Sequence, residues 1–186
     1  MTLHRWRWIP NALTFLRILL IIPFAGALLE GSYRLSLVIF AVAATTDALD
    51  GFLARHFNWR SRLGAIADPL ADKALLISAY LMLTFTGVLP LWLFAVVLGR
   101  DLVIVAGGLL YHYGVGRFEM EPSIPGKINT FVQVLVVLAI IILMAGLPMP
   151  SWVMEAGVLL VAASAVFSGC HYTVVWSARA WRAKRS

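Results

Sequence analysis

Apolar segments of about 20 residues, the length that a helix needs to cross a bilayer, follow one another along almost the whole chain. Hydrophobic residues make up 61% of the 186 residues, and the mean hydropathy is +0.88, far above that of a soluble domain. The sequence therefore predicts an all-α integral membrane protein with a single domain over residues 1–186. Its six transmembrane helices are expected at Pro10–Leu29, Leu35–Leu53, Gly64–Phe85, Leu91–Tyr111, Lys127–Ala145 and Trp152–Trp176.

The positions of the lysines and arginines predict the orientation of these helices. With six spans both termini lie on one side of the membrane, and that side receives all but four of the 15 cations. Arg34 alone lies on the other side, and the remaining three cations fall within spans. Since loops rich in lysine and arginine stay in the cytoplasm, we expect both termini there. Topology and attraction to anionic lipid account for the net charge of +6, so no nucleic-acid partner is expected.

Four of the five aspartates lie in one short stretch of this apolar chain, at positions 47, 50, 68 and 72. An ionised aspartate at the centre of a membrane helix costs roughly 2.5–3.5 kcal/mol, so four that faced lipid would cost about 10 kcal/mol. These side chains must therefore converge on something positive inside the protein.

Helical spacing arranges the four acids as two pairs just below the cytoplasmic surface. Asp47 and Asp50 are three residues apart near the end of the second predicted helix, and Asp68 and Asp72 are four apart near the start of the third. Each pair therefore shares one helix face. Carboxylate oxygens suit Mg²⁺ or Mn²⁺, and four carboxylates can hold two such ions. A proton relay or a cation pathway in a small transporter is the alternative that intramembrane acids leave open.

Small residues and one cation flank the acids. Gly51 and Gly64 allow a backbone or a ligand to approach closely. Ala54 adds space one turn beyond Asp50, and Arg55 is a fixed cation suited to phosphate. Taken singly, these residues are explained as well by helix packing and topology; together they favour a site for metal and phosphate.

The spacing of these positions resembles the full motif of the CDP-alcohol phosphotransferases, here Asp47-x2-Asp50-Gly51-x2-Ala54-Arg55-x8-Gly64-x3-Asp68-x3-Asp72. The opening segment from Ile9 to Arg17, IPNALTFLR, resembles that of bacterial phosphatidylglycerophosphate synthases and cardiolipin synthases of this family. The resemblance covers nearly the whole chain. It implies a multi-pass protein of the bacterial inner membrane whose active site faces the cytoplasm.

The resemblance also implies a reaction, in which a phosphatidyl group passes from CDP-diacylglycerol to an alcohol and CMP leaves. It places two divalent cations, Mg²⁺ or Mn²⁺, on the four aspartates and makes Asp72 the general base. Gly51, Ala54 and Gly64 would leave room for the cytidine, and Arg55 would contact a donor phosphate. The family further implies a homodimer.

Polar residues outside the acidic stretch are candidates for binding the donor or the acceptor: Asn11, Thr14, Arg17, Arg100, Lys127 and Asn129. Each has a plain structural alternative, such as a helix cap for Asn11 or an internal partner for Arg100. The segments around Arg100 and Lys127 resemble the eukaryotic-type cardiolipin synthases, which implies phosphatidylglycerol as the acceptor and cardiolipin as the product. Gly126 departs from the serine expected in that group.

Two further alternatives stay open. Glycerol-3-phosphate, the acceptor of the phosphatidylglycerophosphate synthases, would make the chain one of those enzymes. A non-catalytic lipid-binding or scaffold protein is the other, although it would not need all four acids.

Overall fold

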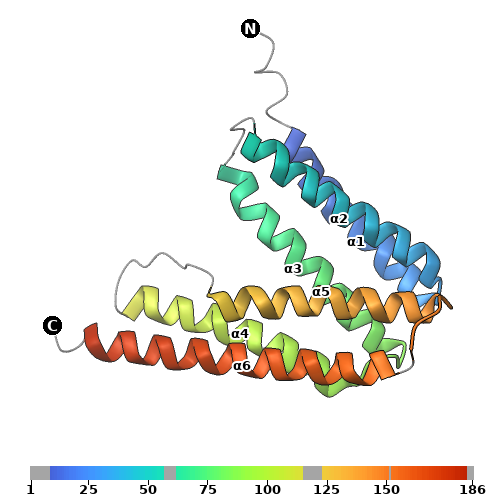
Figure 1. Ribbon diagram of the computed structural model, residues 1–186. Coiled ribbons are helices and arrows are strands. Elements are labelled where there is room, and N and C mark those ends of the chain that lie inside the picture. The colour runs from blue at the N-terminus through green and yellow to red at the C-terminus, as the bar shows by residue number, and fades with distance from the viewer. Residues whose placement is uncertain (1–8, 57–61, 115–122, 151, 184–186) are drawn as a thin grey trace, which may run out of the picture. The chain divides into compact units, whose positions relative to one another are not determined.

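The computed structural model describes residues 9–56, 62–114, 123–150 and 152–183, and this part of the chain is all-helical. Its six helices lie within a few residues of the predicted segments, apart from a longer last helix, and they confirm the all-α class (Figure 1). They are α1 (Ile9–Leu29), α2 (Tyr33–His56), α3 (Arg62–Phe85), α4 (Leu91–Gly114), α5 (Ile124–Met144) and α6 (Trp152–Ala183).

The helices form two compact units, which are described separately. The first unit comprises Met1–Val88 and Ile141–Met149, and within it α1 packs against both α2 and α3. The second unit comprises Leu89–Ile140 and Pro150–Ser186, and within it α4 packs against α6. The acidic stretch therefore belongs to the first unit, whereas Arg100, Lys127 and Asn129 belong to the second.

Two residues after the last residue of α1, α3 and α5 stands a glycine with a left-handed backbone. Gly31, Gly87 and Gly146 have φ angles of 70°, 74° and 76°, which only glycine adopts without strain. In each case the next residue donates its N–H to the carbonyl five residues back, as Ser32 does to Ala27 at 2.8 Å. This is the Schellman ending, and it fixes these three helix ends at or next to the predicted positions.

Close helix contacts in the second unit depend on glycine. A Cβ atom added at Gly107 of α4 would lie 2.9 Å from Cε3 of Trp176 on α6. A Cβ atom added at Gly157 of α6 would lie 2.9 Å from Cγ1 of Val136 on α5. Both glycines therefore serve packing within the chain, because any larger side chain would force the helices apart.

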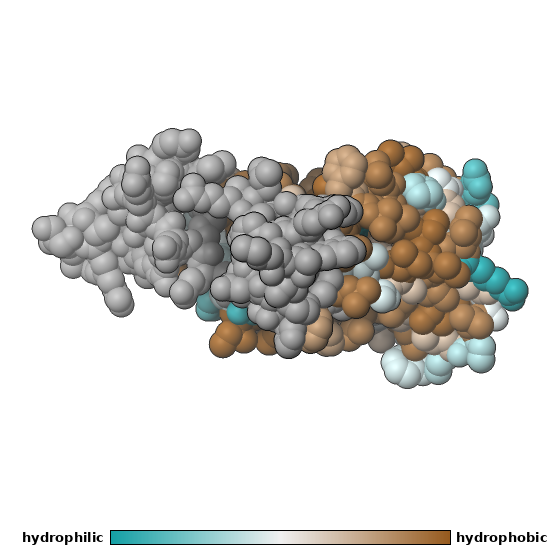
Figure 2. All heavy atoms as spheres, turned by 90° about the horizontal axis from the view of Figure 1, so that it is seen from above, coloured by the Kyte–Doolittle hydropathy of each residue, from teal (hydrophilic) through white to brown (hydrophobic). Residues whose placement is uncertain are grey.

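The surface of the described part is largely apolar. Side chains such as Ile22, Phe131 and Phe167 are exposed, and hydrophobic residues dominate the described surface seen in Figure 2. Within the described residues, four helical segments are long and apolar enough to cross a membrane: Ala12–Leu29, Leu91–Gly108, Ile124–Met144 and Trp152–Ser177. They indicate a multi-pass membrane protein. The helices that carry the acids, α2 and α3, are not among the four.

Candidate functional site

Arg17 of α1 contacts the acids of both α2 and α3. Its Nη2 lies 2.8 Å from Oδ1 of Asp47, and its Nη1 donates to Oδ1 of Asp72 at 2.5 Å. The Arg17 side chain is only 1% exposed, whereas the two aspartate side chains are 47% and 48% exposed. A buried guanidinium needs such partners, because an unpaired charge is costly to bury. Arg17 thus holds one oxygen of each carboxylate in a fixed place.

Thr14 makes a parallel contact one turn earlier on α1. Its hydroxyl donates to Oδ1 of Asp68, and the Thr14 side chain is buried. Thr14 and Arg17 are three residues apart on α1, and their partners Asp68 and Asp72 are four apart on α3, so both pairs use one face of each helix. The structure therefore brings together residues that the sequence predicted for separate roles, two in substrate binding and two in metal binding.

A divalent metal fits the donor chemistry of this site, since carboxylate oxygens are the ligands that Mg²⁺ and Mn²⁺ prefer. Arg17 supplies one positive charge against the three carboxylates of Asp47, Asp68 and Asp72. Among the residues whose side chains are described, no three His, Cys, Asp or Glu side chains form a group that could hold a metal. The side chain of the fourth acid, Asp50, lies outside that set. The two-metal site stays a prediction based on the four acids.

Several other predicted residues lie in the helices of the first unit, but their side chains fall outside the described part: Asn11 on α1; Gly51, Ala54 and Arg55 on α2; and Gly64 on α3. Their predicted roles beside the nucleotide and the phosphate stay predictions.

Arg100 is the centre of a second polar cluster, in the second unit. Its Nε and Nη2 donate to the hydroxyl of Ser168 on α6, at 3.1 and 2.7 Å, and its Nη1 donates to Oδ1 of Asp101 at 2.9 Å. The ring of Tyr172 lies beside the guanidinium, with 5.9 Å between Cζ and the ring centroid. The Arg100 side chain is 9% exposed. Arg100 therefore has internal partners, Ser168 and Asp101, as the structural alternative to a binding role predicted.

The three predicted residues of the second unit lie in different environments. Arg100 and Lys127 both line a cavity of about 520 Å³, whose other lining residues include Thr130 and Tyr172, and Lys127 is exposed. Asn129 is fully buried, and its Oδ1 accepts a hydrogen bond from Ser164 at 2.9 Å. The structure therefore brings Arg100 and Lys127 to one cavity and leaves Asn129 in the packing between α5 and α6.

The residues of α6 that support this cluster were not among those predicted from the sequence. Ser164, Ser168 and Tyr172 are spaced four residues apart and contact Asn129, Arg100 and the start of α5. A stripe of polar residues at this spacing marks one face of a helix, and it was the signal that could have identified them.

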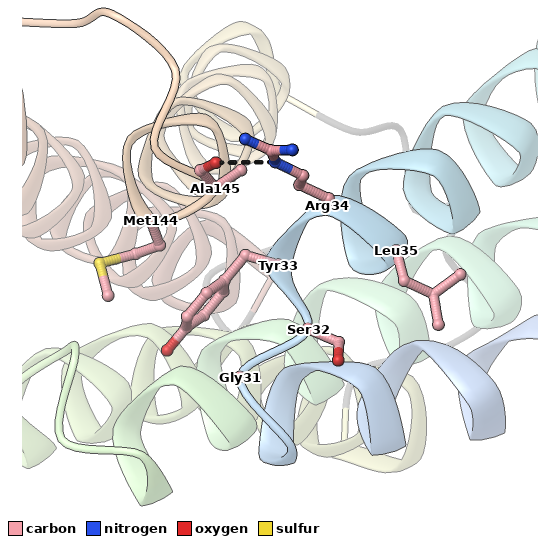
Figure 3. A pocket seen from close by; sticks show the side chains of 7 residues that line it. All are labelled: Gly31, Ser32, Tyr33, Arg34, Leu35, Met144 and Ala145. Atoms are coloured by element: carbon pink, nitrogen blue, oxygen red, sulfur yellow. Dashed lines mark hydrogen bonds between the residues drawn. The ribbon is translucent and has the colours of Figure 1, made fainter.

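A second cavity, of about 430 Å³, lies in the first unit at the turn from α1 to α2. Residues Gly31 to Leu35 line it together with Met144 and Ala145 (Figure 3). Nε of Arg34 donates to the carbonyl of Ala145 at 3.3 Å, where a cation stabilises the end of α5. None of the predicted site residues whose side chains the structure describes lines this cavity.

The chain matches one family of known proteins. The family model described as CDP-alcohol phosphatidyltransferase matches residues 7–168. The chain is 33% identical over 147 residues to human cardiolipin synthase (CMP-forming), which covers 70% of this chain and 49% of the human protein. It is 38% identical over 138 residues to the CDP-diacylglycerol–glycerol-3-phosphate 3-phosphatidyltransferase of Aquifex aeolicus, which covers 73% of this chain and 76% of that protein. The chain thus spans about half the length of the human relative.

Proposed function

Because the chain belongs to the CDP-alcohol phosphatidyltransferase family, we propose that it transfers a phosphatidyl group from CDP-diacylglycerol to an alcohol and releases CMP. The match to residues 7–168 includes every predicted site residue. The structural observation that carries the proposal is the contact of Arg17 with both Asp47 and Asp72, because it joins acids from both halves of the motif in one unit. The match favours this reading over a cation transporter or a scaffold.

In the proposed reaction the hydroxyl oxygen of the acceptor forms a bond to the phosphorus of the phosphatidyl group. The bond from that phosphorus to the oxygen of CMP breaks, and CMP leaves with the electron pair. The carboxylate of Asp72 accepts the proton of the attacking hydroxyl, because an alcohol is a poor nucleophile until it loses that proton. Arg17 holds the carboxylates of Asp47 and Asp72 in place through its contacts with both.

Asp47, Asp50, Asp68 and Asp72 are the residues that would hold two divalent cations. When bound, such cations supply positive charge that stabilises the pyrophosphate of the donor and the leaving phosphate of CMP. Gly51, Ala54, Arg55 and Gly64 are proposed to border the donor, on the strength of their motif positions.

Phosphatidylglycerol is the acceptor that we propose, with cardiolipin as the product. The sequence around Arg100 and Lys127 supports it, as do the relatives named as cardiolipin synthases. Relatives named for transfer to glycerol-3-phosphate support the alternative acceptor equally well. Both acceptors carry a phosphate group, and the cations of Arg100 and Lys127 on one cavity suit such an anion.

The membrane arrangement and the assembly are also proposals. We infer that α2 and α3 cross the membrane with the four apolar helices, that both termini lie in the cytoplasm, and that the membrane is a bacterial inner membrane. The asymmetric distribution of lysine and arginine supports this orientation. A homodimer is proposed from the family, and native mass measurement in mild detergent tests it.

The purified protein in detergent tests the transferase proposal directly. CDP-diacylglycerol and Mn²⁺ or Mg²⁺ are supplied, phosphatidylglycerol and glycerol-3-phosphate are offered in separate reactions, and CMP release is measured. We expect CMP release that depends on phosphatidylglycerol, with cardiolipin as the lipid product. Turnover with glycerol-3-phosphate alone would establish the alternative. No CMP release with either acceptor, from folded protein, would overturn the transferase proposal.

A further inference from the structure

Tyr172 of α6 contacts two parts of the second unit that the proposed function uses. The face of its ring lies near the guanidinium of Arg100, with 5.9 Å between Cζ and the centroid, a distance at which cation and ring attract each other. Its hydroxyl oxygen accepts a hydrogen bond from the backbone N–H of Ser123 at 2.9 Å. One side chain therefore joins α4, through Arg100, to the start of α5.

Ser123 caps the N-terminus of α5. Its hydroxyl accepts from the N–H of Gly126 at 3.2 Å, and its carbonyl accepts from the N–H of Lys127 at 3.0 Å. These are the contacts of an N-cap residue, and they set the position of the first turn. The hydrogen bond from the N–H of Ser123 to Tyr172 therefore ties the turn that carries Lys127 to α6.

Gly126 leaves the space that Tyr172 occupies. A Cβ atom at this position would lie 2.8 Å from the hydroxyl oxygen of Tyr172, 3.2 Å from its Cε2 and 3.2 Å from Nη2 of Arg100. A Cβ atom essentially never lies within 3.0 Å of a non-bonded heavy atom from another part of the chain. Even alanine at position 126 would therefore displace the tyrosine hydroxyl. Gly126 and Tyr172 thus form a matched pair beside the guanidinium.

Arg100 and Lys127 border the same cavity, and Gly126 and Tyr172 line it as well. Ser168 and Asp101 hold three of the guanidinium nitrogens from within the unit. Two cations bind a phosphate more tightly when their separation is fixed before the ligand arrives, because ordering them afterwards costs affinity. Tyr172 is the side chain that touches both the guanidinium and the cap of the turn that carries Lys127.

We propose that Tyr172, with Gly126 as its matching glycine, is a positioning residue that sets the separation of Arg100 and Lys127 and so the affinity for the phosphate of the acceptor. The inference rests on the proposed function for the identity of the acceptor, but the anion affinity that it predicts does not depend on turnover. The ligand chemistry is a phosphate monoester or a phosphodiester.

Two point variants separate positioning from simple packing. Tyr172→Phe keeps the ring beside Arg100 and removes only the hydroxyl that holds Ser123. Gly126→Ala displaces that hydroxyl by its added Cβ atom, and a melting temperature measured in parallel shows that the variant is folded. Thr173→Val is the matched control, because it removes a hydroxyl from the exposed neighbour of Tyr172. That hydroxyl donates to the carbonyl of Gly169 in the same helix at 2.7 Å.

The first measurement is the binding of inorganic phosphate and of glycerol-3-phosphate to the full-length protein in detergent, by calorimetry and without donor. We expect Tyr172→Phe and Gly126→Ala each to weaken anion binding by about threefold to tenfold, the range that one hydrogen bond typically contributes. Thr173→Val should bind as the wild type does. In the double variant the Gly126→Ala effect should shrink, because the hydroxyl that it displaces is already gone.

The second measurement is steady-state transfer with glycerol-3-phosphate and with phosphatidylglycerol in mixed micelles, which distinguishes the two sources of the phosphate. The KM for whichever acceptor supports turnover should rise by the same factor, with kcat and the KM for CDP-diacylglycerol nearly unchanged. Unchanged anion affinity in both variants, strictly additive effects, or no phosphate binding to the wild type would each overturn the positioning role. Weakened anion binding without any CMP release would instead overturn the transferase proposal and leave the positioning role standing.

Discussion

Arg17 donates from Nη1 to Oδ1 of Asp72 at 2.5 Å, and this bond ties α1 to α3 at the edge of the acidic stretch. The same guanidinium reaches Asp47 on α2, so a single buried cation links three helices. Helical spacing in the sequence predicted the two acidic pairs. Arg17 was predicted to bind the donor or the acceptor. The structure shows Arg17 as an internal counter-charge of the acids, which changes what its replacement should do.

We expect Arg17→Met to reduce the free energy of unfolding by about 1–3 kcal/mol. Breaking a fully buried ion pair costs about 3–5 kcal/mol and an exposed pair contributes at most about 1 kcal/mol; here the arginine is buried but its partners are half exposed. Unfolding in detergent, followed by helicity, measures the loss. Arg34→Met is the matched control, because Arg34 is exposed and makes one long bond to Ala145. Equal losses in both variants would contradict the role assigned to Arg17.

Divalent cations should stabilise the protein, and the acids should determine by how much. At a Mn²⁺ concentration of 100 times the dissociation constant, the expected gain is about 2.7 kcal/mol. Asp68→Asn keeps an oxygen that can accept from the hydroxyl of Thr14, so its fold should persist while its Mn²⁺ affinity falls by at least about tenfold. Melting temperatures across a Mn²⁺ titration measure both effects. An Asp68→Asn protein that Mn²⁺ stabilises as strongly as it does the wild type would remove Asp68 from the metal site.

Removal of the proposed base should be visible in the rate. Asp72→Asn cannot accept the proton of the acceptor hydroxyl, so kcat should fall by about 10²–10⁴-fold, the usual contribution of a general base. CMP release at saturating substrates measures it, and a melting temperature in parallel shows whether the weakened contact to Arg17 has unfolded the protein. A folded variant that retains more than a tenth of the wild-type rate would show that another group takes the proton.

Most of the helix boundaries could be predicted because they depend on local chemistry. The ends of α1 and α3 follow from an apolar run of the right length closed by Gly31 and Gly87. The prediction ended the last helix at Trp176, whereas α6 continues to Ala183, because hydropathy measures the part that suits lipid and a helix can extend into water beyond it. In the same way α5 begins before Lys127, at the turn that Ser123 caps.

The site was harder to predict, since it depends on contacts between helices. Spacing within one helix shows that Asp68 and Asp72 share a face, but not which residues of another helix meet that face. Thr14 and Arg17 meet it because of the register in which α1 packs against α3, which no single-helix pattern contains. The support of Arg100 by Ser168 and Tyr172 depends likewise on the packing of α4 against α6.

Two glycines of α4 should respond in opposite ways to the same substitution. Gly107→Ala places a Cβ atom 2.9 Å from the ring of Trp176, and we expect a loss of about 1–3 kcal/mol, as for other overpacked sites. Gly99→Ala meets nothing within 4 Å, and alanine gains up to about 1 kcal/mol over glycine in a helix. Unfolding of the two variants in the same detergent measures the difference. A Gly107→Ala protein as stable as Gly99→Ala would show that the contact between α4 and α6 yields at little cost.

The hydrogen bond from Ser164 to the buried Asn129 gives the last prediction. The hydroxyl of Ser164 donates to Oδ1 of Asn129 at 2.9 Å, and Asn129 is fully buried between α5 and α6. Ser164→Ala leaves that oxygen without its donor, and an unpaired buried polar group costs about 1–3 kcal/mol. We therefore expect a lower free energy of unfolding in Ser164→Ala and recovery in Ser164→Thr, which restores the hydroxyl. Because Asn129 does not reach the cavity surface, the acceptor KM of folded Ser164→Ala should stay near the wild-type value. A large rise in KM without any loss of stability would instead place Asn129 in direct contact with the acceptor.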